Sequence, residues 1–586
     1  MFKDLTRRDF VKTTSLAALG FFVAGCGGGD NKAASSGGDK ADLVVYGKIF
    51  TSEDNQIVEA FAVKDGKYIY VGDKKGAEPF IEQGKTEVID YTGKGLVMPG
   101  CGNGHAHYSA GHAIQAVGTV FDKSYSLEKL FAESIPAAVK KAREVGAKAI
   151  FGSGWDRNFP PDFPYRQQLD AICDDIPIYF SDEEGHKGMA NTLALVNAGI
   201  MSKDGTVLKK EMRGGVIAIG ADGTPTGYLS EQAGTFVRSF LDNDNLFSVD
   251  IAKETMEKIQ EHLLSEGYTM YIDGWGNYFY TDNLYKAANQ MDKAGDMKFV
   301  LGLTYEIEGW MNPDEALSKA VDAQKYASTR VKTNWIKLFI DGTVETGTGF
   351  IEPVYKDGHQ GSINWSEEAM TDITRKANEN GLTMHIHAMG NAGVNRVVNS
   401  FVNGGKDEMR NTLVHVYGVM ESDYKRMAEH NIYVTEGMLW HHNSDELKNF
   451  LLERLPGDMG EKGFPMKSYF DNGVVMSSHS DFPALVGSPD DPFGIMEIAV
   501  TGLFYKEQAS QPWWPEELIT REQAIESLTI NVAKQMFLEN ERGSIKTGKY
   551  ADFLLVDKDV LTCPEKEIHE AKPAATYFEG KKVFSA

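Results

Sequence analysis

The central part of the chain alternates short apolar runs with longer segments of helical periodicity. Seven such runs occupy residues 268–273, 299–305, 335–340, 382–387, 413–417, 432–435 and 474–478. Apolar runs of this length, separated by amphipathic helices, are typical of buried parallel strands. An eighth run, 96–99, comes earlier in the chain and leads into His105. Eight strands that alternate with helices predict an α/β fold of the (β/α)8 TIM-barrel type.

Residues 108–262 interrupt this alternation. They separate the first apolar run from the second and lack the regular exchange of strand and helix patterns. We therefore expect a large insertion after the first barrel strand, lying over the mouth of the barrel. Because loops at the carboxyl ends of barrel strands build the binding site, this insertion is expected to supply substrate specificity.

The two ends of the chain share a different pattern. Residues 41–96 and 543–586 contain short apolar runs broken by turn signals, among them Asp65-Gly66, which is a strong hairpin signal. Neither end alone has enough strands to bury a core. We expect both ends to form one small composite β-sandwich, which leaves residues 97–542 for the barrel and its insertion.

The first forty residues are expected to direct export and to lie outside the fold. Residues 1–25 contain Arg7-Arg8, resembling a twin-arginine signal, and an apolar stretch too short for a membrane span. The stretch ends before Cys26 in a sequence that resembles a lipobox, and residues 26–40 have the composition of a flexible tether. The alternative is a plain signal peptide with a chance cysteine. The prediction is an exported protein on the periplasmic or cell-surface face of a bacterial membrane, held only by a lipid anchor on Cys26.

Composition narrows the class of protein. The 586 residues are 42% hydrophobic and carry a net charge of −24. A globular protein is expected, and no nucleic-acid partner, because phosphate binding needs clustered lysine and arginine. Four cysteines make no disulfide framework. All 14 histidines lie at or after residue 105, so any imidazole chemistry belongs to the body of the chain.

His105 and His107 are the first candidates for metal binding. On a strand, residues two apart share a face, so both imidazoles can reach one ion. Paired surface histidines are the alternative. The position just after an apolar run favours a site, because barrel active sites gather at the carboxyl ends of the strands.

Further ligand-type residues stand in corresponding places. His387, His415 and Asp481 lie at or just after the ends of later strands, and Lys337 lies inside one. A lysine within a barrel strand is costly unless it is paired or modified. It could pair with a carboxylate such as Asp341, or it could form a carbamate and act as an anionic bridging ligand. Packing alone does not account for so many ligand-type residues at matching positions.

Together these residues resemble the amidohydrolase superfamily. Local segments are similar to its YtcJ-like (amidohydrolase 3) group from about residue 41 to the end of the chain. The segments that carry the resemblance are Gly154-Trp155-Asp156 with Leu169-Asp170, Gly185-His186 with Asn191, Gly223-Thr224-Pro225-Thr226-Gly227 with Glu231, and Lys337-Leu338-Phe339-Ile340-Asp341-Gly342.

The resemblance implies a metal-dependent hydrolase of C–N (amide-type) bonds. It implies two divalent ions, zinc first and Mn²⁺ or Fe²⁺ as alternatives, with a metal-bridging hydroxide. The implied ligands are His105, His107, Lys337 as its carbamate, His387, His415 and Asp481. Asp481 would also be the catalytic general acid and base. His186, Glu231 and His479 are the candidates for substrate binding.

Several residues receive other expectations. Before the histidine pair, Cys101 is expected to be an inert buried thiol, and Asn103, which replaces the family's aspartate, to loosen the support of the first ligand. His385 is expected to pack in the barrel. His441-His442 is expected in a solvated loop, with a substrate contact as the alternative, and Trp513-Trp514 is assigned to packing or the surface. A structural or exposed role is expected for His112, His262, His359, His430 and His569.

Other functions remain open at the level of sequence. A deaminase of the same superfamily usually carries a glutamate three residues after the strand-five histidine, where this chain has Gly390. A non-catalytic ligand-binding lipoprotein would be expected to have an incomplete ligand set. The substrate is expected to be a small amide-type molecule, and amides, N-acyl amino acids, formamides and cyclic ureides all fit. A homodimer is among the assemblies left open.

Overall fold

The computed structural model describes residues 40–183, 185–212, 214–442, 445–483, 490–506 and 511–586. The expected export signal, Cys26 and all but the last residue of the expected tether lie outside the described residues. Among the helices within these ranges, none combines the length and the apolar composition of a membrane span.

Eight parallel strands form the central barrel, as predicted. Their order around the barrel is β6 (Cys101–Ala106), β13 (Tyr268–Asp273), β14 (Val300–Glu306), β15 (Val331–Phe339), β16 (Thr383–His387), β17 (Thr412–Val414), β18 (Tyr433–Glu436) and β19 (Met476–Ser478). The segment after β19 joins β6 through two backbone hydrogen bonds, from Asp481 N to His105 O (3.1 Å) and from His107 N to Phe482 O (2.7 Å). The barrel is therefore nearly closed.

The first barrel strand is not the one predicted. Leu96–Pro99 forms β5, which pairs with β20 (Phe553–Val556) in the sheet of the chain ends, and β6 takes its place in the barrel. Strand β6 lacks an apolar run because its glycines face crowded neighbours. A Cβ on Gly104 would lie 2.3 Å from Thr435 Oγ1. Hydropathy does not measure close packing of the backbone, so the sequence pattern did not predict this strand.

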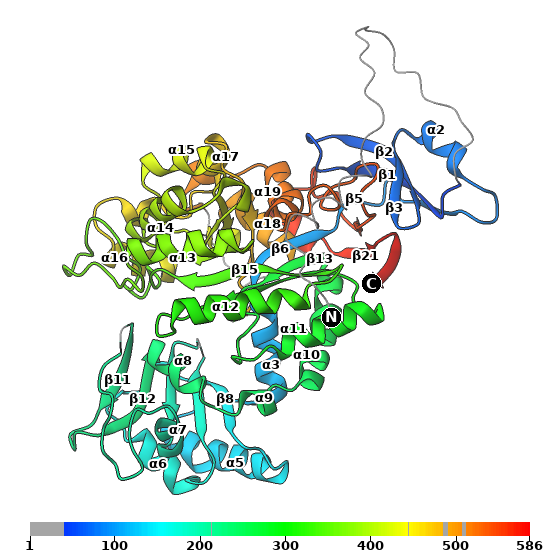
Figure 1. Ribbon diagram of the computed structural model, residues 1–586. Helices are drawn as coiled ribbons and strands as arrows, with labels where there is room; N and C mark the ends of the chain where they lie inside the picture. Colours follow the sequence, from blue (N-terminus) through cyan, green and yellow to red (C-terminus); the bar gives the residue numbers. More distant parts are fainter. Residues whose placement is uncertain (1–39, 184, 213, 443–444, 484–489, 507–510) are drawn as a thin grey trace, which may run out of the picture. The chain divides into compact units, whose positions relative to one another are not determined.

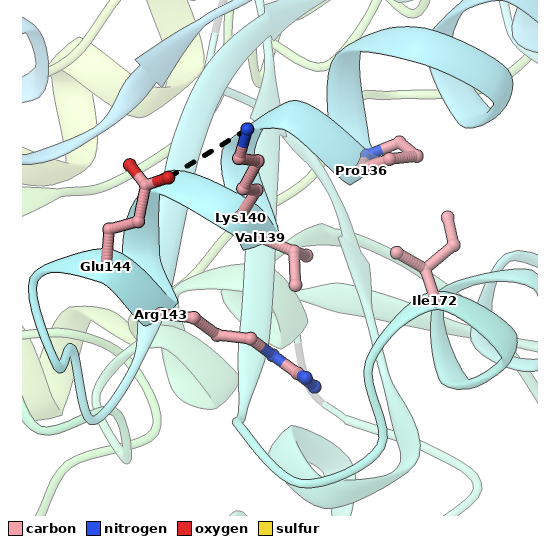
Figure 2. A pocket seen from close by; sticks show the side chains of 6 residues that line it. All are labelled: Pro136, Val139, Lys140, Arg143, Glu144 and Ile172. Carbon is pink, nitrogen blue, oxygen red and sulfur yellow. Dashed lines mark ion pairs between the residues drawn. The ribbon is translucent and has the colours of Figure 1, made fainter.

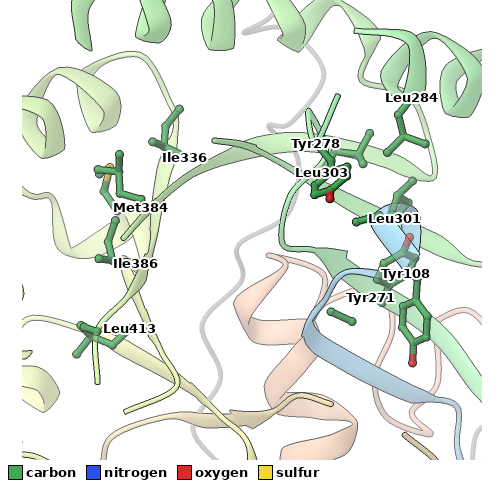
Figure 3. Packing of buried hydrophobic residues seen from close by; sticks show 14 of the residues in the cluster. Tyr108, Tyr271, Tyr278, Leu284, Leu301, Leu303, Ile336, Met384, Ile386 and Leu413 are labelled. Carbon is green, nitrogen blue, oxygen red and sulfur yellow. The ribbon is translucent and has the colours of Figure 1, made fainter. Parts of the chain in front are cut away.

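The strands bury opposite faces against different partners. In β15, Ile336 and Leu338 belong to the large apolar cluster that also contains helix residues such as Leu284 of α11 (Asn283–Ala294). Figure 3 shows Ile336, Ile386 and Leu413 from successive strands in this packing. Alternation then turns Lys337 to the other face, into the barrel.

The interior of the barrel changes from apolar to polar along its length. Met270, Ile272 and Trp335 form an apolar cluster with Val532 and neighbouring residues of α20 (Ile530–Gln535), which fills one end. The polar side chains follow toward the carboxyl ends of the strands. The fold thus leaves the carboxyl end for chemistry.

Helices α12 (Pro313–Ala323), α13 (Glu367–Glu379), α14 (Asn391–Gly404) and α15 (Glu421–Glu429) alternate with the strands (Figure 1). Their starts are set by local chemistry. The side chain of Ser366 accepts a hydrogen bond from Ala369 N and caps α13, and Asn312 caps α12 with Pro313 at the first helical position. A left-handed glycine, Gly295, ends α11.

Both ends of the chain join in one sheet, shown in blue and red in Figure 1. Its members are β1 (Leu43–Phe50), β2 (Ile57–Lys64), β3 (Lys67–Gly72), β4 (Glu87–Asp90), β5, β20, β21 (Pro573–Phe578) and β22 (Lys581–Ser585). Strands β5 and β1 lie between β2 and β20 in the sheet. The rings of Phe61 in β2 and Phe553 in β20 are nevertheless only 4.9 Å apart. The sheet is therefore strongly curved and encloses its own core. Asp65 and Gly66, both at positive φ, form the predicted hairpin turn.

The segment between β6 and β13 contains a third sheet. Its strands are β7 (Thr119–Val120), β8 (Ile150–Trp155), β9 (Ile178–Asp182), β10 (Lys187–Ala190), β12 (Pro225–Glu231) and β11 (Gly215–Ile219), in that order across the sheet. The nearby helices include α3 (Tyr108–Val117), α5 (Ile135–Glu144), α6 (Tyr165–Ile172), α8 (Gln232–Arg238) and α10 (Val249–Glu266). Trp155, Phe180 and Met189 belong to a separate apolar core in this segment.

A surface pocket of about 500 Å³ lies on α5 of this segment (Figure 2). Its lining consists of Pro136, Val139, Lys140, Arg143, Glu144 and Ile172. Lys140 and Glu144 form an ion pair across one turn of the helix at 4.0 Å. No predicted site residue lines this pocket.

Candidate metal centre

The carboxyl ends of the barrel strands bring imidazole and carboxylate groups together around Asp481. Its Oδ1 atom lies 3.2 Å from His107 Nε2, 3.4 Å from His105 Nε2 and 3.9 Å from His415 Nε2. His105 and His107 lie at the end of the first barrel strand and Asp481 follows the last, and they meet because β6 and β19 are neighbours. Two groups have the spacing of a metal site: His105, His107 and Asp481, and His415, His479 and Asp481.

Lys337 and His387 complete the predicted set nearby. Lys337 Nζ lies 3.4 Å from His105 Nε2, and the His387 ring is 5.0 Å from that of His415. His387 Nε2 also lies 3.2 Å from the carbonyl oxygen of Gly342. All six predicted ligands therefore occupy one region, although His387 is not part of either tight group.

The suggested pair of Lys337 with Asp341 is wrong. Asp341 is buried and accepts hydrogen bonds from the backbone N–H groups of Phe350, Met389 and Gly390. It holds the loops after β15 and β16 together. Burial raises the pKa of Asp341 to about 7, against the effect of these hydrogen bonds. Lys337 is left to face the site.

Burial favours the neutral form of four imidazoles at the centre, those of His105, His387, His415 and His479. It lowers the pKa of His387 and of His479 to about 3, and Lys337 lowers that of His387 further. Burial also lowers the pKa of His105 and His415 well below the ordinary value. A neutral imidazole offers a lone pair, which is the form that binds metal.

The two charged groups of the centre are shifted as well. Burial lowers the pKa of Lys337 to about 8, although Asp481 and Glu306 favour its charged form. Burial raises the pKa of Asp481, but the close approach of His107 and the positive charge of Lys337 outweigh it and hold the value below normal. Asp481 is therefore a carboxylate near neutral pH.

A glycine makes room for His105. A Cβ on Gly274, just after β13, would lie 2.1 Å from His105 Cε1. His415 and Asp481 both have positive φ, 69° and 53°. Non-glycine residues in this left-handed region are uncommon and cluster at functional sites. The backbone is thus shaped around these side chains.

The donor set fits a divalent ion. Several buried imidazoles and one carboxylate converge, and this mixture suits zinc and similar ions. His107 Nδ1 is buried and has no hydrogen-bond partner among the described residues. Buried imidazoles beside a carboxylate, together with the unpaired Nδ1 of His107, are what a site that binds a metal ion would contain.

The three predicted substrate-binding residues lie in two places. His186 Nδ1 and Glu231 Oε2 are 3.0 Å apart, and both side chains are about half exposed. His186 is near enough to His387 for its charge to affect the pKa of that group. His479, in contrast, is buried within the centre, with its Nε2 3.1 Å from His415 Nδ1.

Two buried carboxyl groups near the centre were missed in the sequence. Asp273 ends β13 and accepts hydrogen bonds from Ser109 N and Tyr271 Oη. Glu306 ends β14, is paired in register with Lys337, and has a pKa raised well above normal, chiefly by burial. Asp273 and Glu306 both stand at the carboxyl end of a strand. The same criterion that identified the other candidates could therefore have predicted them from the sequence.

Aromatic rings that carry no polar motif also border the centre. Phe339 lies 4.7 Å from the His387 ring and Trp440 lies 5.4 Å from that of His415, while Trp275 lies 6.2 Å from the His107 ring. No sequence signal distinguishes these rings from ordinary core residues.

Other expectations were tested by burial and contacts. His441 is buried, with its ring nitrogens 3.2 Å from Phe464 O and 3.1 Å from Trp514 O, so the solvated loop is wrong for this residue. Trp514 is fully buried, and Cys101 is a buried thiol whose pKa burial raises.

Asn103 supports the first ligand rather than loosening it. Its Oδ1 accepts hydrogen bonds from His105 N (3.3 Å) and Ser480 N (3.2 Å), and its Nδ2 donates to Ser480 Oγ (2.7 Å). An amide both donates and accepts, which an ionised aspartate does not. Asn103 therefore ties β6 to the segment that carries Asp481.

A (β/α)8 barrel with such a cluster at the carboxyl ends of its strands defines the class of metal-dependent barrel hydrolases. The chain belongs to the amidohydrolase family, whose model matches residues 87–584, and to its YtcJ-like branch. It is a hydrolase of the amidohydrolase superfamily, and two groups of residues at the carboxyl ends of its barrel strands have the spacing to hold a divalent metal ion.

Three similar proteins illustrate the relationship. The chain is 27% identical over 544 residues to N-substituted formamide deformylase from Arthrobacter pascens, covering 90% of this chain and 95% of that protein. It is 24% identical to the putative amidohydrolase YtcJ from Bacillus subtilis (strain 168), covering 92% and 98%. An uncharacterized metal-dependent hydrolase from Pyrococcus furiosus has the same fold, with a TM-score of 0.66, 21% identity and coverage of 89% and 100%.

Proposed function

We propose that this protein hydrolyses C–N bonds of amide-type small molecules, with Asp481 as the general acid and base. The observation that carries the proposal is the position of Asp481 Oδ1 among the Nε2 atoms of His105, His107 and His415, at 3.2–3.9 Å. A buried carboxylate with a lowered pKa is ready to accept a proton at neutral pH.

The proposed centre holds two zinc ions. Their ligands would be His105, His107, the carbamate of Lys337, His387, His415 and Asp481. The pKa of about 8 for Lys337 supports the carbamate, because only a neutral amine reacts with carbon dioxide, and burial makes that form accessible. The carbamate would convert a buried cation into an anion that suits neighbouring cations.

The protein groups would then divide the work. Bound divalent ions make a water more acidic and polarise a carbonyl oxygen. Asp481 would accept the proton of the attacking water at a carboxylate oxygen and deliver it to the leaving nitrogen. Neutral imidazoles and a buried setting exclude competing protonation of the site.

Substrate recognition is proposed for the segment that precedes β13. His186 and Glu231, 3.0 Å apart and half exposed, offer polar contacts, and Gln232 joins this segment to Glu308 after β14 by a hydrogen bond of 2.8 Å. The similarity to a protein named as a formamide deformylase puts N-substituted formamides first among the amide-type candidates.

A deaminase is disfavoured by Gly390. Gly390 is the N-cap of α14, and a Cβ there would lie 2.2 Å from Phe350 O. The backbone leaves no room for the glutamate that would shuttle protons in a deaminase. Hydrolysis of an amide-type bond therefore remains the better proposal.

Export and assembly are proposed from the sequence. The Arg7-Arg8 motif and Cys26 support an exported protein with a lipid anchor. Cys26→Ala should release the protein from membranes, and its retention there would contradict the anchor. The proposed homodimer is tested by light scattering of the detergent-solubilised protein, and a monomer mass at micromolar concentration would contradict it.

Metal analysis and a substrate screen test the function. Purified protein loaded with zinc should contain two ions per chain, and His107→Asn should contain fewer. His430→Asn is a matched control, because His430 is partly exposed and contacts Asp407, away from the centre. The loaded enzyme should release amine from an N-substituted formamide, an amide or an N-acyl amino acid. Absence of bound metal, or of turnover across these classes, would contradict the proposal.

A further inference from the structure

Two proposed ligands are each bonded to a second histidine. His105 Nδ1 lies 2.7 Å from His385 Nε2, and His415 Nδ1 lies 3.1 Å from His479 Nε2. All four imidazoles are buried. The same pair of ring nitrogens is used in both contacts, although the residues come from different strands.

The chain places these second histidines by the same spacing. His385 precedes His387 by two residues, and His479 precedes Asp481 by two. Along a strand, residues two apart share a face, so His385 lies in the barrel interior, one layer below His387. His385 is also paired in register with Lys337. A position in the interior was expected to mean packing, but the contact is polar.

The hydrogen positions follow from the chemistry of a neutral imidazole. Such a ring has one N–H donor and one acceptor nitrogen. If His105 offers the lone pair of Nε2 to a metal, its Nδ1 carries the hydrogen and donates to His385 Nε2. His385 then carries its own hydrogen on Nδ1. The same reasoning applies to His415 and His479.

An unusual feature agrees with this assignment. The Nδ1 atoms of His385 and His479 are both buried and have no hydrogen-bond partner among the described residues. An unpaired buried polar group destabilises the folded state. The unpaired Nδ1 atoms at two matching positions are explained if Nε2 of each ring is needed as a hydrogen-bond acceptor for a ligand histidine.

We propose that His385 and His479 are positioning residues that accept hydrogen bonds from His105 and His415 and thereby fix the tautomer in which Nε2 of each ligand faces the metal. This inference rests on the proposed metal centre. A carboxylate or a backbone carbonyl usually fills this role. A neutral imidazole orients the ligand without adding negative charge beside Asp481.

The competing assignment makes His479 a ligand. Its ring nitrogen lies within 4.8 Å of ligand atoms of His415 and Asp481, which is a metal-site spacing. The two roles differ in a measurable way. Loss of a ligand lowers the number of ions held at saturation, whereas loss of a positioning residue lowers the affinity and leaves the number unchanged.

The test compares leucine and glutamine at each position. Zinc affinity is measured by competition with a chromophoric chelator, and the saturated zinc content by elemental analysis. His385→Leu and His479→Leu should each weaken zinc binding by about 10–100-fold with an unchanged ion count. His385→Gln and His479→Gln should restore most of the affinity, because the amide oxygen accepts a hydrogen bond near the former Nε2.

The results separate this inference from the metal centre itself. If wild-type protein binds zinc and the leucine variants bind it equally well, the inference fails alone. It also fails for a histidine whose leucine variant loses an ion at saturation. If wild-type protein binds no zinc, the metal centre fails and the inference with it.

A measurement on the unaltered protein covers the case in which a leucine variant does not fold. Histidine-labelled, zinc-loaded protein is examined by long-range ¹H–¹⁵N NMR. The expected spectrum has His385 and His479 neutral with hydrogen on Nδ1. Hydrogen on Nε2 of either ring would overturn the proposed donor direction and the role built on it.

Discussion

The absence of a side chain at Gly274 leads to a sharp prediction. Gly274→Ala adds one methyl group, which would lie 2.1 Å from His105 Cε1 and 2.6 Å from its Nδ1. The φ of Gly274 is outside the left-handed region, so alanine suits the backbone. His105 has little freedom to retreat, because His385 Nε2 lies 2.7 Å and Lys337 Nζ 3.4 Å from its ring nitrogens.

The size of the effect follows from these distances. The imidazole of His105 must move by about 1.3 Å to reach the 3.4 Å of an ordinary contact. Overpacking of this kind costs about 1–3 kcal/mol of stability. A displacement of about 1 Å in an active site lowers the rate by about 10²-fold. We therefore expect a moderate loss of stability and a much larger loss of zinc affinity and turnover.

The assay combines urea unfolding of the metal-free protein, chelator competition for zinc and kcat with the substrate found in the screen. Gly309→Ala is the matched control, because its Cβ would meet only the side chain of Gln232, at 3.5 Å from Oε1 and 3.9 Å from Cδ. That variant should behave like wild type. Wild-type zinc affinity and kcat in Gly274→Ala would refute the reasoning, as would equal damage in Gly309→Ala.

Further predictions concern the catalytic carboxylate, the terminal sheet and the pH dependence of stability. Asp481→Asn should lower kcat by about 10²–10⁴-fold and leave the unfolding transition intact, and an unchanged kcat would contradict its proton role. Arg542→Met leaves the buried Asp552 without its guanidinium partner, while Glu579 keeps its pair with Arg330, and should lower the free energy of unfolding in urea by about 3–5 kcal/mol. The exposed control Arg375→Met should change it by less than about 1 kcal/mol, and similar losses in both would contradict this account. Burial lowers the pKa of His441 to about 4, so from pH 6.5 down to 4 the unfolded state takes up a proton that the folded state does not, and stability falls by about 1.4 kcal/mol per pH unit. His441→Gln should remove the contribution of His441 to the pH dependence of stability. In unfolding experiments on metal-free protein, the free energy of unfolding of the variant minus that of wild type should therefore rise as the pH falls from 6.5 to 4.5. A difference that stays constant with pH would contradict the lowered pKa of His441.

Most barrel strands were predictable because their apolar runs are continuous. The run at 268–273 coincides with β13, and the later runs overlap their strands with shifts at the ends. The prediction of the first barrel strand was wrong for a physical reason. Strand β6 packs closely through its glycine backbone and has no apolar run, whereas the apolar run before it belongs to β5 in another sheet. Hydropathy measures side-chain burial and has no sensitivity to close approach of the backbone.

The candidate site divides along similar lines. Ligand-type residues at strand ends, such as His107 and Asp481, could be predicted because a parallel barrel brings all carboxyl ends together. The contacts between His105 and His385, or between Asn103 and Ser480, could not, because they depend on register between strands far apart in sequence. The pairing of His186 with Glu231 depends in turn on the third sheet, whose strands have no simple repeat.

The pairing of β5 with β20 sets an order for events during synthesis. Strand β5 pairs with residues 553–556, which leave the ribosome about 450 residues later. Until then, the edge of β5 remains open, and open edges of this kind pair readily with other chains. The same delay applies to β6, whose neighbour after β19 lies near residue 481. During synthesis β5 and β6 therefore pass through a long interval in which each has an unpaired edge exposed to aggregation, and a chaperone that shields residues 96–106 would have its greatest effect during that interval.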